Sequence, residues 1–224
     1  MADAERSIED AVAKTHVIRN EVMRTLMTSQ SWPEQALTEM ATVASGSTPS
    51  RTRADFWSSG VVPWVRTAEI NFSTISDTAE RITWSAVRET GLRVFPSGTV
   101  LLAMYGEGVT RGRSAILGVE ATVNQAAAAI VCEKQLLVPQ FLFHWLESNY
   151  RELRKIGHGS NQTNLNASLV ESIRLPLPPL EMQHQVVNHL ATFDAQLSAN
   201  THELNKLRQL KLGLVDDVLA GNSR

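Results

Sequence analysis

The sequence predicts an α+β fold, with one mixed α/β domain between long coiled-coil-forming helices at both ends of the chain. Two observations predict this arrangement. Residues 3–29 and 180–220 contain no proline and place apolar residues at helical spacing. Residues 45–174 instead contain recurrent Gly and Pro and short apolar runs that alternate with turns. The predicted divisions are an N-terminal helix pairing with the C-terminal helix (1–30), the mixed domain (31–179) and a coiled-coil helix (180–224).

The N-terminal helix is predicted by five apolar residues at near-helical spacing: Ile8, Val12, Ile18, Val22 and Leu26. The sequence Ser31-Trp32-Pro33 is expected to end it, because a proline disfavours helical backbone in the residue before it.

Four apolar runs in the middle of the chain indicate strands, and they lie at 61–62, 99–104, 114–117 and 127–132. Residues 139–150 indicate a short helix that has Pro139 in its first turn. Together these elements predict a mixed domain with long loops.

The C-terminal helix carries apolar residues on an alternating 4–3 ladder, which is typical of a coiled-coil seam. The ladder consists of Val186, Leu190, Phe193, Leu197, Leu204, Leu207, Leu214 and Val218, with Asn200 and Lys211 at its two polar positions. Polar residues on a seam lower stability but fix register and partner number. The 3–29 helix is the expected antiparallel partner. It is shorter, which leaves part of the seam for a second chain or another protein.

The link into this helix contains Pro176, Pro178 and Pro179. Proline fixes φ and favours extended chain, so we expect a stiff connection that holds the domain at a set angle to the helix.

Composition is that of a globular protein, with 43% hydrophobic and 20% charged residues among 224. No run of about 18 apolar residues predicts a membrane span, and residues 1–10 are too polar for a secretory signal. The single cysteine, Cys132, cannot form an internal disulfide and is expected in the core. These features favour a cytoplasmic protein.

Charge is distributed unevenly. The net charge is −2, but residues 45–174 hold 13 basic and 11 acidic side chains, whereas the two ends hold 8 and 12. Arginine outnumbers lysine by 16 to 5, and its planar fork suits phosphate and guanine. A GC-rich genome would explain the same bias. The nearly neutral domain predicts weak nonspecific DNA binding.

Motifs for catalysis are missing from the sequence. It has no dinucleotide or phosphate-binding glycine loop, no His-Glu-x-x-His pattern, no Gly-x-Ser-x-Gly elbow and no Asn/Asp-Pro-Pro-aromatic tetrapeptide. We therefore expect no catalytic residue, no metal and no cofactor on this chain.

Three polar loops are candidate DNA readers, because Arg pairs with guanine and Asn or Gln with adenine. They are residues 46–53, 104–113 and 157–166. Ordinary turns with self-capping side chains would have similar composition. The candidate DNA-binding residues are Arg51, Arg53, Tyr105, Arg111, Arg113, Ser160, Asn161 and Gln162.

Other conspicuous side chains are expected to be structural. Phe56, Trp57, Trp64 and Trp84 are interpreted as core residues or loop anchors rather than base-stacking groups. Asn124 and Gln125 lead into an apolar strand, where amides usually brace backbone.

The sequence resembles the DNA specificity (S) subunit of type I restriction-modification systems. Gly46-Ser47-Thr48-Pro49-Ser50 is similar to the opening of that family's target recognition domain, and Gly98 to Gly106 with Ala121 to Ala126 to its middle. Gly159 to Asn166, then Ile173 to Gln183, resemble the domain's end and the start of the spacer helix.

The resemblance implies a non-catalytic subunit that directs methyltransferase (M) and restriction (R) subunits to DNA, with S-adenosylmethionine bound by the M subunit. Family members usually carry two recognition domains, and this chain shows no second copy of the 45–174 pattern. It therefore implies a half-length subunit that forms a homodimer and reads a palindromic bipartite site. A coiled-coil adaptor that modulates a full-length S subunit, or an enzyme with an unrecognised site, are the alternatives.

Overall fold

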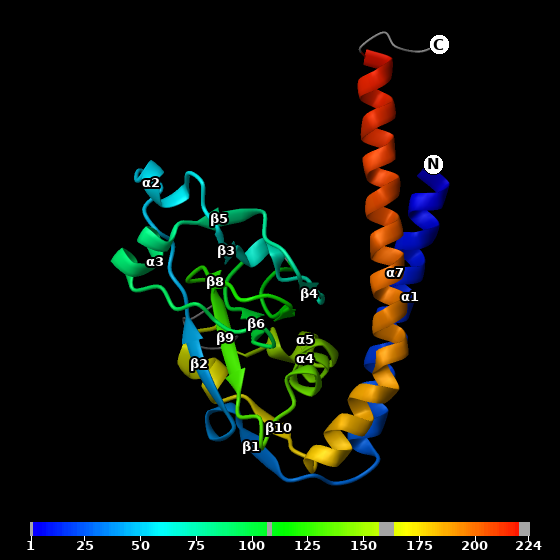
Figure 1. The fold of residues 1–224 in the computed structure, drawn as a ribbon. Helices are drawn as coiled ribbons and strands as arrows, with labels where there is room; N and C mark the ends of the chain where they lie inside the picture. The colour runs from blue at the N-terminus through cyan, green and yellow to red at the C-terminus, as the bar shows by residue number, and fades with distance from the viewer. Residues whose placement is uncertain (1, 107–108, 157–163, 220–224) are drawn as a thin grey trace.

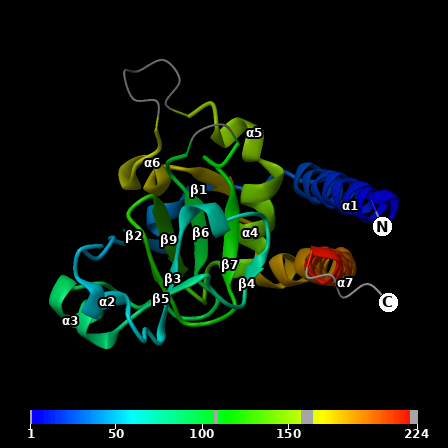
Figure 2. The same ribbon diagram turned by 90° about the horizontal axis from the view of Figure 1, so that it is seen from above.

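The computed structural model describes residues 2–106, 109–156 and 164–219, with the side chains of Ala2 and of residues 214–219 left out. Two long helices, α1 (Ala2–Thr28) and α7 (Leu180–Leu219), lie side by side and form what we call the stalk. The segment between them, residues 29–179, folds into what we call the head, which lies to one side of the stalk (Figures 1 and 2). The α+β fold with long terminal helices is thus confirmed.

Three sheets organise the described part of the head. A five-stranded sheet has the order β2-β9-β6-β7-β4, a three-stranded sheet the order β5-β3-β8, and a two-stranded ribbon joins β1 to β10. The strands are β1 (Glu34–Ala36), β2 (Ala41–Ser45), β3 (Val62–Val65), β4 (Thr74–Ile75), β5 (Glu80–Ile82), β6 (Val100–Ala103), β7 (Ser114–Leu117), β8 (Thr122–Val123), β9 (Ala127–Cys132) and β10 (Arg174–Pro176).

Among the residues that the structure describes, the head also contains five short helices: α2 (Ala54–Trp57), α3 (Trp84–Thr90), α4 (Pro139–Ser148), α5 (Tyr150–Leu153) and α6 (Ala167–Glu171). Single turns of 3-10 helix lie at Leu37–Glu39 and Thr67–Glu69. Local sequence explains several of their ends. Pro139 occupies the first turn of α4. The Thr83 hydroxyl caps α3 by accepting from Ala86 N (3.2 Å), and Gly91 ends that helix at φ 66°.

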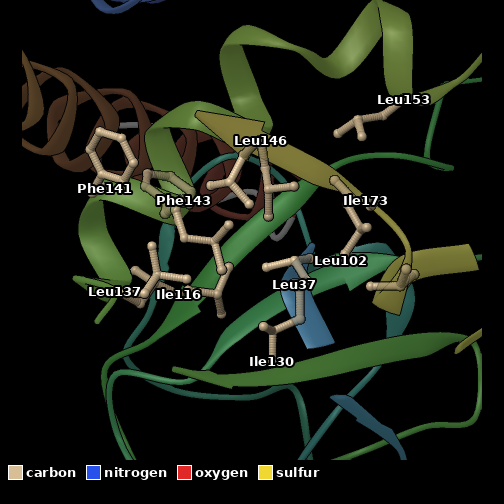
Figure 3. Close-up of a cluster of buried hydrophobic side chains, with 14 of the residues drawn as sticks. Leu37, Leu102, Ile116, Ile130, Leu137, Phe141, Phe143, Leu146, Leu153 and Ile173 are labelled. Atoms are coloured by element: carbon tan, nitrogen blue, oxygen red, sulfur yellow. The ribbon is translucent and has the colours of Figure 1, made fainter. Parts of the chain in front are cut away.

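The five-stranded sheet is buried on both faces. Along β6, Val100 and Leu102 face one core while Leu101 and Ala103 face another, as strand geometry requires. The first core lies between the sheet, α4 and the stalk. Figure 3 shows Leu102, Ile116 and Ile130 of the sheet beside Phe143 and Leu146 of α4. The second lies between the sheet and β3, β8 and their loops. Expected strands at 99–104, 114–117 and 127–132 correspond to β6, β7 and β9.

Cys132 ends β9 at the margin of the first core. It is half-buried rather than fully enclosed, and burial raises the pKa of its thiol to about 12. The thiol therefore stays protonated and unreactive at neutral pH.

The link between head and stalk, residues 175–180, is fixed by backbone pairing as well as by its prolines. β10 pairs antiparallel with β1, and Leu177 N donates to Pro33 O (2.9 Å). Both crossings between head and stalk therefore run side by side. The predicted stiff link is tied into a strand pair, which the prolines alone did not indicate.

The two stalk helices are antiparallel. Ion pairs join Glu9 to Arg208 (2.6 Å) and Glu5 to Lys211 (3.2 Å), so the start of α1 lies near the end of α7. On the seam of α7, Val186, Leu190, Leu197 and Leu204 are buried; Phe193, Asn200 and Leu207 are half-buried; Lys211 is exposed. The side chains of Leu214 and Val218 lie outside the described residues.

The α1 face of the seam differs from the expected one at its centre. Ile18 was expected on the apolar face but is 52% exposed, while Thr15 and Arg19 are buried. The contacts explain the difference, because Arg19 meets two carboxylates there.

Candidate nucleic-acid interface

The described residues of the three loops selected from the sequence meet at one edge of the five-stranded sheet. β9 pairs antiparallel with both β2 and β6, so these two strands end where β9 begins. Ser47 N donates to Val123 O (3.1 Å) and Met104 N to Ala126 O (2.8 Å). Leu165 N donates to Met104 O (3.1 Å), which brings the end of the third loop to the same place. We call residues 46–53, 104–106, 109–113, 124–126 and 164–166 the loop edge.

The first loop is pinned closely to the sheet. Gly46 lies so near β8 that a Cβ there would stand 1.6 Å from Val123 O. Trp64 Nε1 donates to Ser47 O (3.0 Å), and Thr48 Oγ1 donates to Gln125 Oε1 (2.6 Å). Only glycine fits the first position, so the loop starts from a defined place.

Arg51 leaves the first loop half exposed, with 50% of its side chain accessible. Its two terminal nitrogens donate to both carboxylate oxygens of Glu80 (2.8 and 2.9 Å). Its guanidinium lies 3.7 Å from the ring centroid of Trp57. The hydrogen bond from Arg51 lowers the pKa of Glu80, so this carboxylate is ionised at neutral pH and neutralises the arginine.

Arg53 is in the same situation, with 47% of its side chain exposed. It forms two hydrogen bonds to Asp55 (2.8 and 2.7 Å) and one to Glu89 (3.2 Å). Its guanidinium lies 4.1 Å from the ring centroid of Phe56. Both arginines of the first loop are accessible to solvent. Arg51 forms an ion pair with Glu80, and Arg53 forms ion pairs with Asp55 and Glu89.

The second loop holds its candidates in different environments. Tyr105 is 37% exposed. Arg111 is 6% exposed and donates to Arg154 O (2.7 Å), and Arg154 in turn donates to the Tyr150 hydroxyl (2.7 Å). Arg111 therefore braces this loop against α5, and base contact by Arg111 stays a prediction.

Arg113 is half-buried, with its guanidinium 6.0 Å from the ring centroid of Phe72. Among the described residues its buried Nε has no hydrogen-bond partner. Phe72 packs edge-on against Tyr150 (5.2 Å between centroids). Arg113 and Phe72 thus lie next to α5, and a DNA contact by Arg113 also stays a prediction.

Most of the third loop, residues 157–163, lies outside the described part of the chain. Ser160, Asn161 and Gln162 lie outside the described residues. Just after them, Asn166 caps α6 by accepting from Leu169 N (2.9 Å).

Two expectations about neighbouring side chains need correction. Gln125 was expected to brace a buried strand, but it is exposed on the loop edge beside Thr48. Trp84 was expected to be a core residue or anchor, but it is 52% exposed on α3. In both cases apolar sequence neighbours suggested burial, while the side chain itself points out of the strand end or helix face.

The other structural expectations agree with the contacts. Asn124 accepts from Thr67 Oγ1 (2.9 Å) and from Ala126 N (3.2 Å). Phe56 and Trp64 are buried and Trp57 is half-buried against them, in the small core formed by α2, α3, β3 and β5.

The part of the chain that the structure describes holds no group of three or more His, Cys, Asp or Glu side chains arranged for a metal ion. Nor is any helix in these described ranges long and apolar enough to cross a membrane.

Residues 30–209 match the protein family described as "Type I restriction modification DNA specificity domain". Among curated relatives, the chain is 23% identical over 180 residues to the EcoR124I/EcoR124II specificity subunit of Escherichia coli, covering 78% of this chain and 44% of the relative. It is 28% identical over 190 residues to the MjaIX specificity subunit of Methanocaldococcus jannaschii, covering 83% and 43%. The chain thus spans about half the length of these relatives.

Solved structures share the fold. The type I restriction-modification S subunit from M. genitalium superposes with a TM-score of 0.72 at 12% identity, covering 95% of this chain and 56% of that one. The HsdS subunit from Thermoanaerobacter tengcongensis gives 0.62 at 18% identity, covering 96% and 53%.

Proposed function

Because this chain belongs to the family of type I restriction modification DNA specificity domains, we propose that it recognises double-stranded DNA as a non-catalytic specificity subunit. The observation that carries the proposal is the loop edge. The described residues of three polar loops from distant parts of the sequence lie at one edge of the five-stranded sheet. Such an edge offers hydroxyl, amide and guanidinium groups to base edges and phosphates.

We assign the first contacts to the exposed members of the loop edge, Arg51, Arg53, Tyr105 and Gln125. On approach of DNA, phosphate oxygens compete with Glu80, Asp55 and Glu89 for the two arginines. Ser160, Asn161 and Gln162 are further candidates from the third loop, and Arg111 and Arg113 support the second loop from behind. Local neutralisation of the arginines agrees with the weak nonspecific binding expected from the near-neutral head.

Tight binding and chemistry are then properties of an assembled complex. The proposed partners are methyltransferase (M) subunits, which bind S-adenosylmethionine and methylate the target, and a restriction (R) subunit for cleavage. This chain recognises the target sequence and needs no cofactor of its own for that role.

The chain is also proposed to act as a homodimer that reads two half-sites. Within one chain, α1 covers the seam of α7 from Val186 to Leu204, so a second chain is not needed there. α7 continues beyond the start of α1 (Figure 1), and Leu210 and Leu212 are 53% and 64% exposed near that end. We place the second copy on this outer part of α7.

Light scattering on the purified chain at micromolar concentration tests the dimer, with an expected mass of twice 24.7 kDa. Leu210→Lys with Leu212→Lys should give a monomer, because two charges would have to be buried. Gln209→Lys, at an exposed neighbouring position, is the matched control and should remain dimeric. A monomeric natural chain, with and without DNA, contradicts the dimer.

Methylome sequencing of cells with and without this gene tests the DNA-reading role. We expect one palindromic bipartite motif to lose methylation when the gene is removed and to return with it. If the chain is instead an adaptor for a full-length S subunit, an asymmetric motif will change in extent while no palindromic motif depends on the gene. Methyl transfer by the purified chain alone would favour the enzyme alternative.

A further inference from the structure

Five ionisable side chains form a cluster where the head meets the stalk. Arg19 on α1 is 2% exposed, and its guanidinium donates to Glu147 on α4 and to Asp194 on α7. His16 Nδ1 donates to Glu147 Oε1 (2.7 Å), and His144 Nε2 donates to Asp194 Oδ2 (3.1 Å). We call these five residues the junction cluster. Arg19 is its centre, because it joins both stalk helices to the head.

A second attachment lies lower on the stalk. Gln183 near the start of α7 is fully buried. Its Oε1 accepts from Val138 N (2.8 Å), and its Nε2 donates to Leu136 O and Pro178 O (both 2.9 Å). Asp194 and Gln183 are eleven residues apart on one helix, which is about 16 Å at 1.5 Å per residue. Two separated attachments fix an orientation, where a single one would leave a pivot.

The chemistry of the junction cluster is better suited to fixing the orientation of the head on the stalk than to stabilising their contact. Burying ions is costly, and a buried ion pair often stabilises a fold no more than packed apolar side chains would. Charge-assisted hydrogen bonds, however, have strict directions and distances. Apolar contacts between α4 and the stalk would tolerate small rotations, whereas Arg19 meets Glu147 and Asp194 together in one arrangement only.

We propose that Arg19 is a positioning residue that fixes the head–stalk angle and thereby the number of base pairs between the two half-sites. This proposal rests on the proposed DNA-reading dimer. In the proposed dimer the two stalks are joined, and each carries one head with its loop edge. Tilting a head relative to its stalk therefore moves its loop edge along the DNA. Successive base pairs are about 3.4 Å apart, so a shift of that size changes the preferred spacer by one base pair.

The first test measures the angle without DNA. Spin labels are placed on the exposed positions Arg88→Cys in the head and Gln209→Cys in the stalk, in a Cys132→Ala background of the full chain. Labelled chain is diluted into an excess of unlabelled chain, so that a dimer carries one labelled copy. Pulsed electron paramagnetic resonance should then give one narrow distance distribution. Arg19→Met with Glu147→Leu removes the two buried charges together. Asp194 remains, but it is 38% exposed and keeps its contact with His144, so the variant should fold. We expect it to widen the distribution at least twofold.

The matched control is Arg24→Met. Arg24 lies on the same helix, but its side chain is 67% exposed and pairs only with Glu21. It should leave the distribution unchanged. Circular dichroism and thermal unfolding establish that each variant is folded.

The second test reads the spacer in cells that carry the complete system with its methyltransferase. We expect methylome sequencing of the double variant to return the same half-site bases. A preference of at least tenfold for one spacer length should fall to threefold or less. A narrow distance distribution, or an unchanged spacer preference, in the folded double variant overturns the proposal. A natural chain that gives no methylation motif overturns the proposed function instead, while the distance measurement still decides whether Arg19 sets the angle.

Discussion

The junction cluster and the loop edge use the same side chain in opposite environments. Arg19 has 3% of its side chain exposed and holds two carboxylates that belong to two other helices. Arg51 has 50% of its side chain exposed and holds a single carboxylate close to its own loop. Breaking the buried Arg19–Glu147 pair leaves a charged group that water cannot solvate. Breaking the exposed Arg51–Glu80 pair lets water or phosphate replace the carboxylate beside the arginine. Arginine content alone therefore does not identify a DNA-binding residue.

The largest effect is expected at the buried pair. Arg19→Met alone leaves the buried Glu147 carboxylate without its cationic partner and with only the hydrogen bond from His16, so we expect a loss of about 3–5 kcal/mol in the free energy of unfolding. Urea denaturation measures it. Adding Glu147→Leu should recover most of the loss, because the stranded charge is removed. A single variant that loses less than about 1 kcal/mol would show that Arg19 is no more coupled than a surface arginine.

A pH dependence should distinguish the two regions next. Burial and the neighbouring Arg19 lower the pKa of His16 from its ordinary 6.5 to about 4, and burial lowers the pKa of His144. Between these pH values the unfolded chain binds protons that the folded chain does not. The free energy of unfolding should therefore fall as pH decreases from 6.5 towards 4, by up to about 3 kcal/mol for His16.

His16→Gln should remove its share of this pH dependence, while His184→Gln on the exposed face of α7 should not. Denaturation series at pH 7, 6 and 5 provide the measurement. A slope that is unchanged by His16→Gln contradicts the assignment.

Arg111 is an intermediate case, because it is buried like Arg19 but belongs to the loop edge. Arg111→Met removes its hydrogen bond to Arg154 O and leaves that partly buried carbonyl without this donor. We expect a loss of about 1–3 kcal/mol in unfolding free energy. DNA affinity should fall as a consequence of the disturbed loop. Full stability combined with lost target recognition would instead make Arg111 a direct reader.

The smallest effect on stability is expected for Arg51→Ala, at under about 1 kcal/mol, because the pair with Glu80 is half exposed. The substitution should nevertheless change the affinity for DNA measurably. If Arg51 contacts phosphate, the slope of log affinity against log salt should fall by about 1. Arg24→Ala on the stalk should change neither quantity. Fluorescence anisotropy with a duplex carrying the methylated motif, measured over a salt series in the assembled complex, provides the readout.

Periodicity in the sequence was sufficient to place both stalk helices and the strands β6, β7 and β9. These elements bury continuous or regularly spaced apolar residues, so local pattern and tertiary burial agree. The two-residue strands β4 and β8 could not be found in this way, because their pairing depends on partners far along the chain. The three loops were also selected from composition. The first two meet at one edge because β2 and β6 flank β9, and the described end of the third joins them through Leu165.

Tertiary structure alone decided which polar residues are buried and what they contact. Arg19 and Glu147 are 128 positions apart, and nothing local to either one marks it as buried. Ile18 is exposed beside Arg19 for the same reason, since the carboxylates of α4 and α7 determine which face of α1 turns inward. Helical spacing is a property of neighbours in sequence, whereas the environment of a charge is set by whatever the fold brings next to it.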